Sequence, residues 1–135
     1  MTGKIVVLIV DDEEMMRSVL GKILEREGYV VHCAASVAEA RVALHRTSVD
    51  IVISDIKMPD ENGYALLAHV KREYPHIGVV LMTGYGDSYT VKDALLLGAD
   101  EYLTKPFKSF EIAFVVERAY WRKMSENKRA VLDSP

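Results

Sequence analysis

The stretch from Val49 to Gly63, VDIVISDIKMPDENG, decides the fold of this chain. Its apolar run, Ile51 to Ile53, leads to Asp55, and the chain then meets a structure breaker at Pro59. A short apolar run bounded in this way predicts a β-strand buried on both faces of a parallel sheet. Asp55 is then expected at the carboxyl end of that strand, the edge where ligands bind to open α/β sheets.

The composition is that of a single globular domain. The chain has 135 residues, 27% of them charged, with a net charge of −3 that gives no support for nucleic-acid binding. The single cysteine, Cys33, excludes an intramolecular disulfide and a cysteine-based zinc site, and its apolar neighbours predict an inert core thiol. No apolar run is long enough for a membrane span or a signal peptide, so we expect a cytoplasmic protein.

Strand-like and helical patterns alternate along the rest of the chain. Four more strands are expected at residues 4–10, 29–34, 78–82 and 100–104, and a helical pattern follows each of the five strands. Five such units with short loops predict an α/β fold, (βα)5, with a doubly wound parallel sheet. The first, third and fourth strands are the most apolar and are expected at its centre.

Each helix is expected to bury one apolar stripe and to begin or end at a capping residue. The stripes are Met16, Val19, Leu20, Ile23 and Leu24; Val37, Ala40 and Leu44; Leu67, Val70 and Tyr74; Val91, Ala94 and Leu95; and Ile112, Val115, Val116 and Ala119. Ser36 and Glu39 form a predicted capping box. Asp87 or Ser88 is expected to cap the fourth helix, and Ser109 the fifth. Gly28 and Gly98 suit helix ends.

Polar side chains follow four of the five predicted strands. Asp11 and Asp12 follow the first strand, Asp55 the third, Thr83 the fourth and Lys105 the fifth. Taken singly, these residues have ordinary readings as a helix cap, a loop carboxylate, a turn residue and a solvated lysine. Those readings do not explain why all five meet at one edge, where right-handed crossovers place every carboxyl end.

The chemistry of this group indicates phosphoryl transfer. Neighbouring carboxylates repel one another, so that either a pKa rises or a cation binds between them, and oxygen ligands with room for water suit Mg²⁺. The metal and Lys105 would offset charge on a phosphoryl group, and Thr83 would donate a hydrogen bond to it. Asp55 would attack in line and form an aspartyl phosphate.

The chain resembles the receiver domain of two-component response regulators over about residues 4–122. The motifs that carry the resemblance are Val10-Asp11-Asp12-Glu13, Asp55 to Gly63 with Met58-Pro59, Met82-Thr83-Gly84 and Lys105-Pro106-Phe107. Any one of them alone is weak, but the four in this order are specific. The resemblance implies a flavodoxin-like sheet of order 2-1-3-4-5 and a cis Lys105-Pro106 bond.

The resemblance also implies roles for the site residues. Asp55 becomes the phospho-acceptor, Asp12 a direct Mg²⁺ ligand and Asp11 a ligand acting partly through water. The backbone carbonyl of Lys57 is a further implied ligand.

Three residues have implied roles in the response to phosphorylation. Thr83 and Lys105 are implied to contact the phosphoryl group. Tyr102 matches the switch aromatic that turns inward as Thr83 moves, with a packed edge-strand tyrosine as the alternative.

Lys57 and Tyr85 occupy the variable positions beside the phosphoryl group. A bulky Tyr85 is expected to shield that group from water, which gives a phosphorylated lifetime of minutes or longer.

The expected partners follow from the resemblance. They are a sensor histidine kinase as phosphodonor and an output domain or downstream protein. The face formed by the fourth helix, fifth strand and fifth helix, about residues 87–120, is expected to change on phosphorylation and to support a homodimer.

The expected domain division is a receiver domain at 1–122 followed by a helical extension, linker or tail at 123–135. Tyr120 and Trp121 would be anchors if that extension forms a dimer. The other reading of the tail is a solvated helix end.

Two rival functions remain open. A Mg²⁺-dependent phosphatase of the haloacid dehalogenase type needs an acid two residues after the nucleophile, where this chain has Lys57. A degenerate receiver used only as an interaction module would not need the complete set of Asp12, Asp55, Thr83 and Lys105. We therefore expect a switch that catalyses its own phosphorylation and dephosphorylation and turns over no external substrate. The four histidines, His32, His45, His69 and His76, are read as structural or surface residues.

Overall fold

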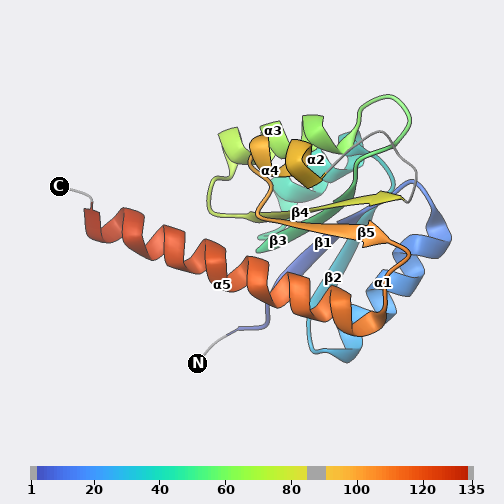
Figure 1. The fold of residues 1–135 in the computed structure, drawn as a ribbon, viewed down its shortest axis with the longest axis horizontal. Coiled ribbons are helices and arrows are strands. Elements are labelled where there is room, and N and C mark those ends of the chain that lie inside the picture. Colours follow the sequence, from blue (N-terminus) through green and yellow to red (C-terminus); the bar gives the residue numbers. More distant parts are fainter. Residues whose placement is uncertain (1–2, 85–90, 134–135) are drawn as a thin grey trace.

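Strands and helices alternate along the whole chain in a computed structural model, which describes residues 3–84 and 91–133 (Figure 1). The elements are β1 (Val6–Val10), α1 (Glu14–Arg26), β2 (Val30–Ala34), α2 (Val37–Arg46), β3 (Ile51–Asp55), α3 (Gly63–Glu73), β4 (Gly78–Gly84), α4 (Val91–Leu96), β5 (Glu101–Lys105) and α5 (Ser109–Asp133). The predicted (βα)5 order is confirmed.

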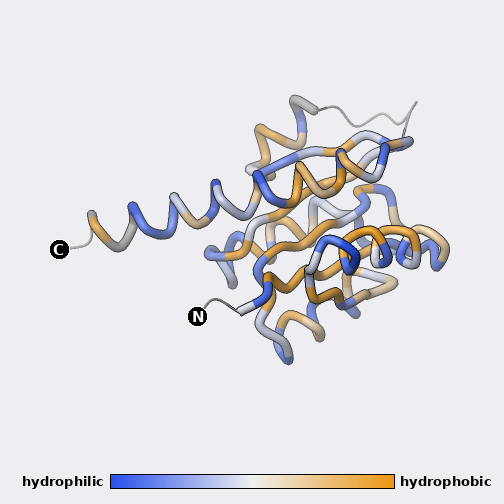
Figure 2. The backbone as a smooth tube through the Cα atoms, turned by 90° about the horizontal axis from the view of Figure 1, so that it is seen from below, coloured by the Kyte–Doolittle hydropathy of each residue, from blue (hydrophilic) through white to orange (hydrophobic). Residues whose placement is uncertain are grey.

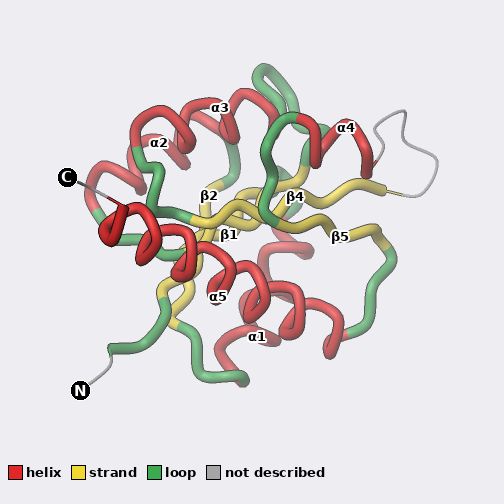
Figure 3. The backbone as a smooth tube through the Cα atoms, turned by 60° about the vertical axis from the view of Figure 1, so that its left-hand side comes forward, coloured by secondary structure: helices red, strands yellow, loops and turns green. Residues whose placement is uncertain are grey.

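The five strands form one parallel sheet in the order β2-β1-β3-β4-β5, as the resemblance implied. The helices α1 and α5 cover one face of the sheet, and α2, α3 and α4 cover the other (Figure 3). Crossovers of this kind place the carboxyl ends of all strands along one edge. In the register of the sheet, Asp55 at the end of β3 lies beside Met82 of β4.

The central strands are buried on both faces because successive side chains point to opposite sides of the sheet. Leu8 and Val52 belong to the core cluster under α2, α3 and α4, whereas Ile9 and Ile53 belong to the cluster under α1 and α5. Figure 2 shows these apolar strands enclosed by the helices. The opening prediction for the strand that carries Asp55 is therefore confirmed.

Most of the predicted helix ends are confirmed by hydrogen bonds or backbone angles. The hydroxyl of Ser36 accepts from the N–H of Glu39 at 3.1 Å, while Oε1 of Glu39 accepts from the N–H of Ala35 at 3.2 Å. Gly28 and Gly98 follow α1 and α4 with φ angles of 95° and 98°, where a side chain would be strained. The cis Lys105-Pro106 bond is also confirmed.

Four local predictions are wrong. Val19 and Leu95 were placed on buried stripes but are 45% and 51% exposed. In α1 the buried side centres on Leu20, Leu24 and a helical glycine instead. Cys33 is exposed rather than a core thiol, because β2 is an edge strand that pairs only with β1. Ser109 is the first residue of α5 rather than its cap. The predicted caps Asp87 and Ser88 lie outside the described residues.

Helix α5 extends past the body of the fold (Figure 1). Its 25 residues span about 37 Å at roughly 1.5 Å per residue. The predicted stripe from Ile112 to Ala119 is buried against the sheet, and the second half of the helix projects beyond it. Among the described residues, no helix combines the length and the apolar character needed to cross a membrane.

Candidate functional site

The predicted polar residues meet at the carboxyl edge of the sheet. Lys105, the last residue of β5, places its Nζ 2.9 Å from Oδ2 of Asp55, which ends β3. The same Nζ lies 3.2 Å from Oδ2 of Asp11, which directly follows β1. Asp55 and Asp11, which lie 50 and 94 positions before Lys105 in the sequence, thus share its ammonium group.

Three carboxylates surround this point. One oxygen each from Asp11, Asp12 and Asp55 lies within 4.8 Å of the other two. Asp11 is fully buried and Asp55 is 6% exposed, whereas Asp12 faces solvent. Three negative charges against the single ammonium of Lys105 leave an excess of negative charge, and hard carboxylate oxygens are the ligands that divalent cations such as Mg²⁺ prefer. This donor set fits a metal ion.

Burial and neighbouring charges together shift the pKa values of Asp55 and Lys105. The pKa of Asp55 is raised above its ordinary value, chiefly by burial; the negative charge of Asp11 raises it further, and bonds from Lys105 and the backbone of Lys57 lower it. Burial would lower the pKa of Lys105, but the attraction of Asp55 and Asp11 outweighs it and raises that pKa. Lys105 therefore stays positively charged beside a carboxylate that is more basic than an exposed one.

A cavity of about 570 Å³ opens over this cluster. It is lined by Asp12, Glu13, Asp55, Lys57, Met58, Pro59, Gly84 and Lys105. The volume accommodates a phosphoryl group with a hydrated cation. Four of these residues were not predicted as site residues, although each lies within a motif that carries the resemblance: Glu13, Met58, Pro59 and Gly84.

The loop between β3 and α3 closes tightly on Asp55. The N–H of Gly63 donates to the carbonyl of Ile56 at 2.8 Å. A Cβ at Gly63 would lie 2.5 Å from the backbone oxygen of Asp55, so only glycine fits this approach without a shift of the backbone. Asp60 adopts a left-handed φ of 67° at the turn of the loop. The exposed Lys57 follows Asp55 at the start of this loop.

The remaining predicted residues lie near the site or outside the described chain. Thr83 is buried in β4, one position beyond the level of Asp55, and pairs in register with Thr104, the neighbour of Lys105. Tyr102 is half-buried on β5 and packs against the core cluster under α2, α3 and α4. Tyr85 lies outside the described residues.

One supporting residue was missed from the sequence. Nη1 of Arg17, on α1, donates to the backbone oxygen of Asp11 at 2.8 Å and so fixes the chain where the first acidic residue leaves the strand. Arg17 lies one helical turn past the acidic motif, and no sequence pattern distinguished it from an ordinary surface arginine.

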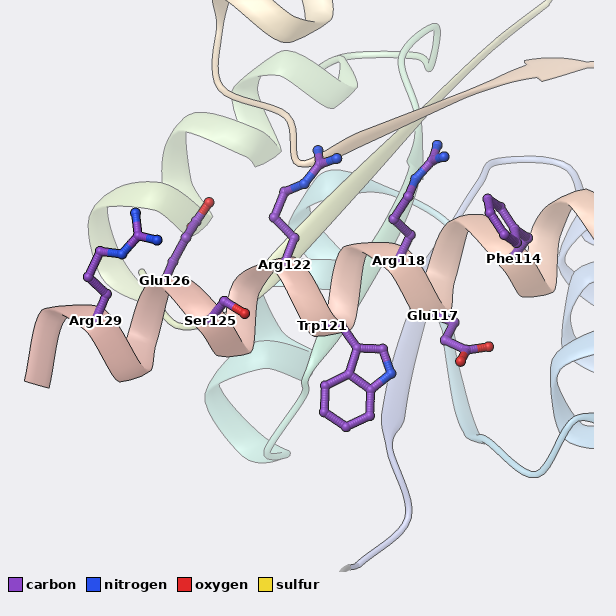
Figure 4. A pocket seen from close by; sticks show the side chains of 8 residues that line it. All are labelled: Phe114, Glu117, Arg118, Trp121, Arg122, Ser125, Glu126 and Arg129. Atoms are coloured by element: carbon purple, nitrogen blue, oxygen red, sulfur yellow. The ribbon is translucent and has the colours of Figure 1, made fainter. Parts of the chain in front are cut away.

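Another cavity, of about 710 Å³, lies away from this site, along α5 (Figure 4). Eight side chains of α5 alone line it, and Arg118 and Arg122 point toward the sheet while Trp121 points away. Both arginines pair with Glu101, at the opposite end of β5 from Lys105. This groove therefore has no contact with the acidic cluster.

Comparisons with known proteins agree with the fold and the site. The family model described as the response regulator receiver domain matches residues 7–117. The TorCAD operon transcriptional regulatory protein TorR of Escherichia coli K12 is 37% identical over 116 residues, which are 86% of this chain and 50% of TorR. The DNA-binding transcriptional regulator NtrC of Proteus hauseri is 34% identical over 126 residues, 92% of this chain and 27% of NtrC. The chain thus spans from about a quarter to a half of the curated relatives that it matches.

Two solved structures cover the same region. A response regulator receiver domain protein from Clostridium thermocellum superposes with a TM-score of 0.81 at 34% identity, over 89% of this chain and 97% of the other. The signal receiver domain of an HD domain-containing protein from Pseudomonas fluorescens Pf-5 gives a TM-score of 0.86 at 30% identity, over 96% of each chain. Because the family model spans most of the sequence and these relatives share the same fold, the chain belongs to the response regulator receiver domain family of two-component signalling.

Proposed function

We propose that this receiver domain is a switch driven by phosphorylation of Asp55. The observation that carries the proposal is the shared position of Lys105 Nζ, within 3.2 Å of both Asp11 and Asp55, in a site where three carboxylates lie within 4.8 Å. Asp11 and Asp55 are buried beside the fixed cation of Lys105, and the exposed Asp12 completes a set of three carboxylates whose excess negative charge suits a second cation. This arrangement suits the transfer of a phosphoryl group, whose charge develops on several oxygens at once.

The proposed reaction begins with a carboxylate oxygen of Asp55 attacking phosphorus. The donor is a phosphohistidine of a sensor kinase or a small acyl phosphate; its P–N or P–O bond breaks as the new O–P bond forms, and the electron pair leaves with the imidazole or the carboxylate. Lys105 neutralises charge on the transferred group, and Thr83 donates a hydrogen bond to it. Asp11, Asp12, Asp55 and the carbonyl of Lys57 would hold Mg²⁺, which when bound offsets phosphoryl charge.

The proposed readout is a change in the face built from α4, β5 and α5. Thr83 moves toward the phosphoryl group, and Tyr102 turns further into the space that this movement opens. The half-buried position of Tyr102 against the core cluster supports this proposal, because part of the residue is still exposed and can become more buried. The packed edge-strand tyrosine remains the alternative.

Two variable residues are proposed to set the lifetime of the phosphoryl group. Lys57 lines the cavity and is exposed, so its ammonium can approach the phosphoryl oxygens. Tyr85, two residues past Thr83, is proposed to shield the group from water. We expect a lifetime of minutes or longer.

The partners are proposed from the family and the relatives. TorR is named as a transcriptional regulatory protein and NtrC as a DNA-binding transcriptional regulator, and this chain matches only part of each. We propose a sensor histidine kinase as donor and an output domain or separate protein as receiver of the signal. A homodimer through the α4-β5-α5 face is a further proposal. The division between a receiver at 1–122 and an extension at 123–135 stays a prediction, since α5 runs unbroken through that point.

The competing function is a phosphatase that hydrolyses external phosphoesters. Such an enzyme needs an acid to protonate its leaving group, and the residue two positions after Asp55 is Lys57. This substitution favours a switch that carries out only its own phosphorylation and dephosphorylation.

The two functions separate in one experiment. The chain and Asp55→Asn are incubated with acetyl phosphate, with Mg²⁺ or with EDTA, and their intact masses are measured. We expect one acid-stable, base-labile phosphoryl group on the wild type with Mg²⁺ and none on Asp55→Asn. Repeated turnover of unrelated phosphoesters would favour the phosphatase, and the absence of any adduct would favour an inert interaction module.

A further inference from the structure

The β3-α3 loop, residues 56–62, forms one wall of the cavity over Asp55. Lys57, Met58 and Pro59 line the cavity, and a backbone hydrogen bond from Lys57 reaches the carboxylate of Asp55. The direction in which the amide and carbonyl of Lys57 point is set by the path of this loop. Whatever holds the loop therefore holds part of the proposed metal site.

The two ends of the loop are fixed within the β3-α3 unit itself. Gly63 closes against Asp55 and Ile56, as described above. Oδ1 of Asn62 accepts from the N–H groups of Tyr64 and Ala65 at 3.0 and 3.1 Å and so begins α3. Between these anchors, Pro59 and Asp60 are exposed.

The turn of the loop is held from outside, by helix α2. Nη1 and Nη2 of Arg41 donate to Oε2 and Oε1 of Glu61 at 2.6 and 3.0 Å, a bidentate pair that joins α2 to the residue after Asp60. Helix α2 is itself anchored, since Val37, Ala40 and Leu44 are buried against the sheet. A fork-shaped contact of this kind fixes direction as well as distance.

We infer that Arg41 is a positioning residue that acts through Glu61 and holds the β3-α3 loop in the form that binds the cation. The inference rests on the proposed function, because it assigns the loop to the metal site of that function. The pair is partly exposed, with the two side chains at 37% and 42%, so it contributes little to the free energy of unfolding. Its effect is on local order, in a loop that otherwise has an exposed turn.

Charge and position make opposite predictions, which allows a sharp test. If Arg41 acted only as a distant positive charge, its removal would strengthen the binding of a cation. If it acts by holding the loop, its removal weakens binding because a less ordered loop must be ordered first. The deciding variant is Arg41→Gln, and the matched control is Arg46→Gln, which removes an exposed arginine from the same helix. Glu61→Gln removes the same contact from the loop side; there the loss of a negative charge and the loss of the contact both weaken binding, so it checks the contact and does not separate the two effects.

Two readouts are needed, one of them independent of phosphorylation. The first is the Mg²⁺ concentration for half-maximal phosphorylation by acetyl phosphate, which we expect to rise about three- to fivefold in both loop variants and to stay unchanged in Arg46→Gln. The second is amide hydrogen exchange of residues 57–61 without metal or donor, which we expect to be faster by a similar factor.

Two further variants test the fork geometry. Arg41→Lys keeps the charge but loses the bidentate contact, and should weaken Mg²⁺ binding in the same direction. The double variant Arg41→Glu with Glu61→Arg should bring both readouts back toward the wild type. Unchanged exchange and an unchanged or lower half-maximal Mg²⁺ concentration in Arg41→Gln would overturn the inference. A wild type that gains no phosphoryl group would overturn the proposed function instead, while hydrogen exchange would still test the contact between Arg41 and the loop.

Discussion

The ammonium group of Lys105 bridges two carboxylates, at 2.9 Å from Oδ2 of Asp55 and 3.2 Å from Oδ2 of Asp11. Its position depends on three strands, because Asp11 follows β1, Asp55 ends β3 and Lys105 ends β5. The proposed chemistry therefore depends on the order of the strands in the sheet. A sheet with another order would not bring these three groups together.

Removal of the bridging cation should slow phosphorylation far more than it changes the fold. In Lys105→Met the transferred phosphoryl oxygens lose a positively charged donor, and the loss of one such group typically slows a reaction by about 100-fold or more. The rate of phosphorylation by acetyl phosphate, followed by intact mass at saturating Mg²⁺, measures this. Lys108→Met, which removes an exposed lysine from the segment that follows β5, should react as the wild type does. A rate within threefold of the wild type for Lys105→Met would contradict the assigned role.

Loss of the exposed acidic ligand should abolish stabilisation by Mg²⁺. A ligand that binds only the folded state at about 100 times its dissociation constant stabilises it by about 2.7 kcal/mol. We expect a thermal midpoint several degrees higher with Mg²⁺ for the wild type and no shift for Asp12→Asn. Without metal, Asp12→Asn should unfold at the same temperature as the wild type or higher, since it removes one of three carboxylates that repel one another. Glu14→Gln, at an exposed acidic position near by, is the control that should keep the shift.

The raised pKa of Asp55 makes the stability of the metal-free protein depend on pH. Burial disfavours the charged form of this carboxyl in the folded state, so its stabilising effect is complete below the unfolded value, near 3.8, and is lost as pH rises through the higher folded pKa. Asp55→Asn removes the titration and should be more stable than the wild type at pH 7 in EDTA, with a difference that shrinks toward pH 3. Urea unfolding at several pH values measures both. A difference that grew as the pH fell would contradict the direction of the shift.

A side chain at residue 63 should disturb both stability and the site. The Cβ of Gly63→Ala would meet the backbone oxygen of Asp55 at 2.5 Å and Cα of Ile56 at 2.9 Å, and neither atom can move without the strand. Overpacking of this kind costs about 1–3 kcal/mol, measurable by urea unfolding. Gly3→Ala adds the same methyl where nothing lies within 4 Å and should leave stability unchanged. Equal stability of the two variants would show that the approach is looser than described.

The buried acid at the start of β5 should help to fix α5 on the sheet. Glu101 is 5% exposed and pairs with Arg118 and Arg122, so that Glu101→Gln leaves two cations without their shared partner. Because both arginines are about half exposed, water offsets much of the loss, and we expect a cost of about 1–2 kcal/mol. Glu117→Gln removes an exposed acid from α5 and should change stability by less than about 0.5 kcal/mol.

The sequence allowed the sheet and the meeting of the polar groups to be predicted, for a physical reason. Apolar runs such as Ile51 to Ile53 can be strands only if both faces are covered, and parallel strands then share one carboxyl edge. Asp55 and Lys105 could therefore be placed together without knowledge of any contact.

The same reasoning could not find contacts between ordinary surface residues. Arg41 and Glu61 lie on a helix and a loop, and nothing in their sequence context marks them as a pair. Helical spacing alone also misplaced Val19, because it predicts a stripe without saying how wide the contact with the sheet is. Cys33 is exposed because β2 lies at the edge of the sheet. At such an edge, a residue can be exposed to solvent even when its neighbours in the sequence are apolar.

The central claim is that Asp55, among the three clustered aspartates, accepts the phosphoryl group. The most direct measurement is reduction of the phosphorylated chain with borohydride, which converts an aspartyl phosphate to homoserine, followed by digestion and peptide sequencing by mass spectrometry. The account predicts homoserine at position 55 and intact aspartate at Asp11 and Asp12. Homoserine at position 11 or 12, with Asp55 unmodified, would contradict it.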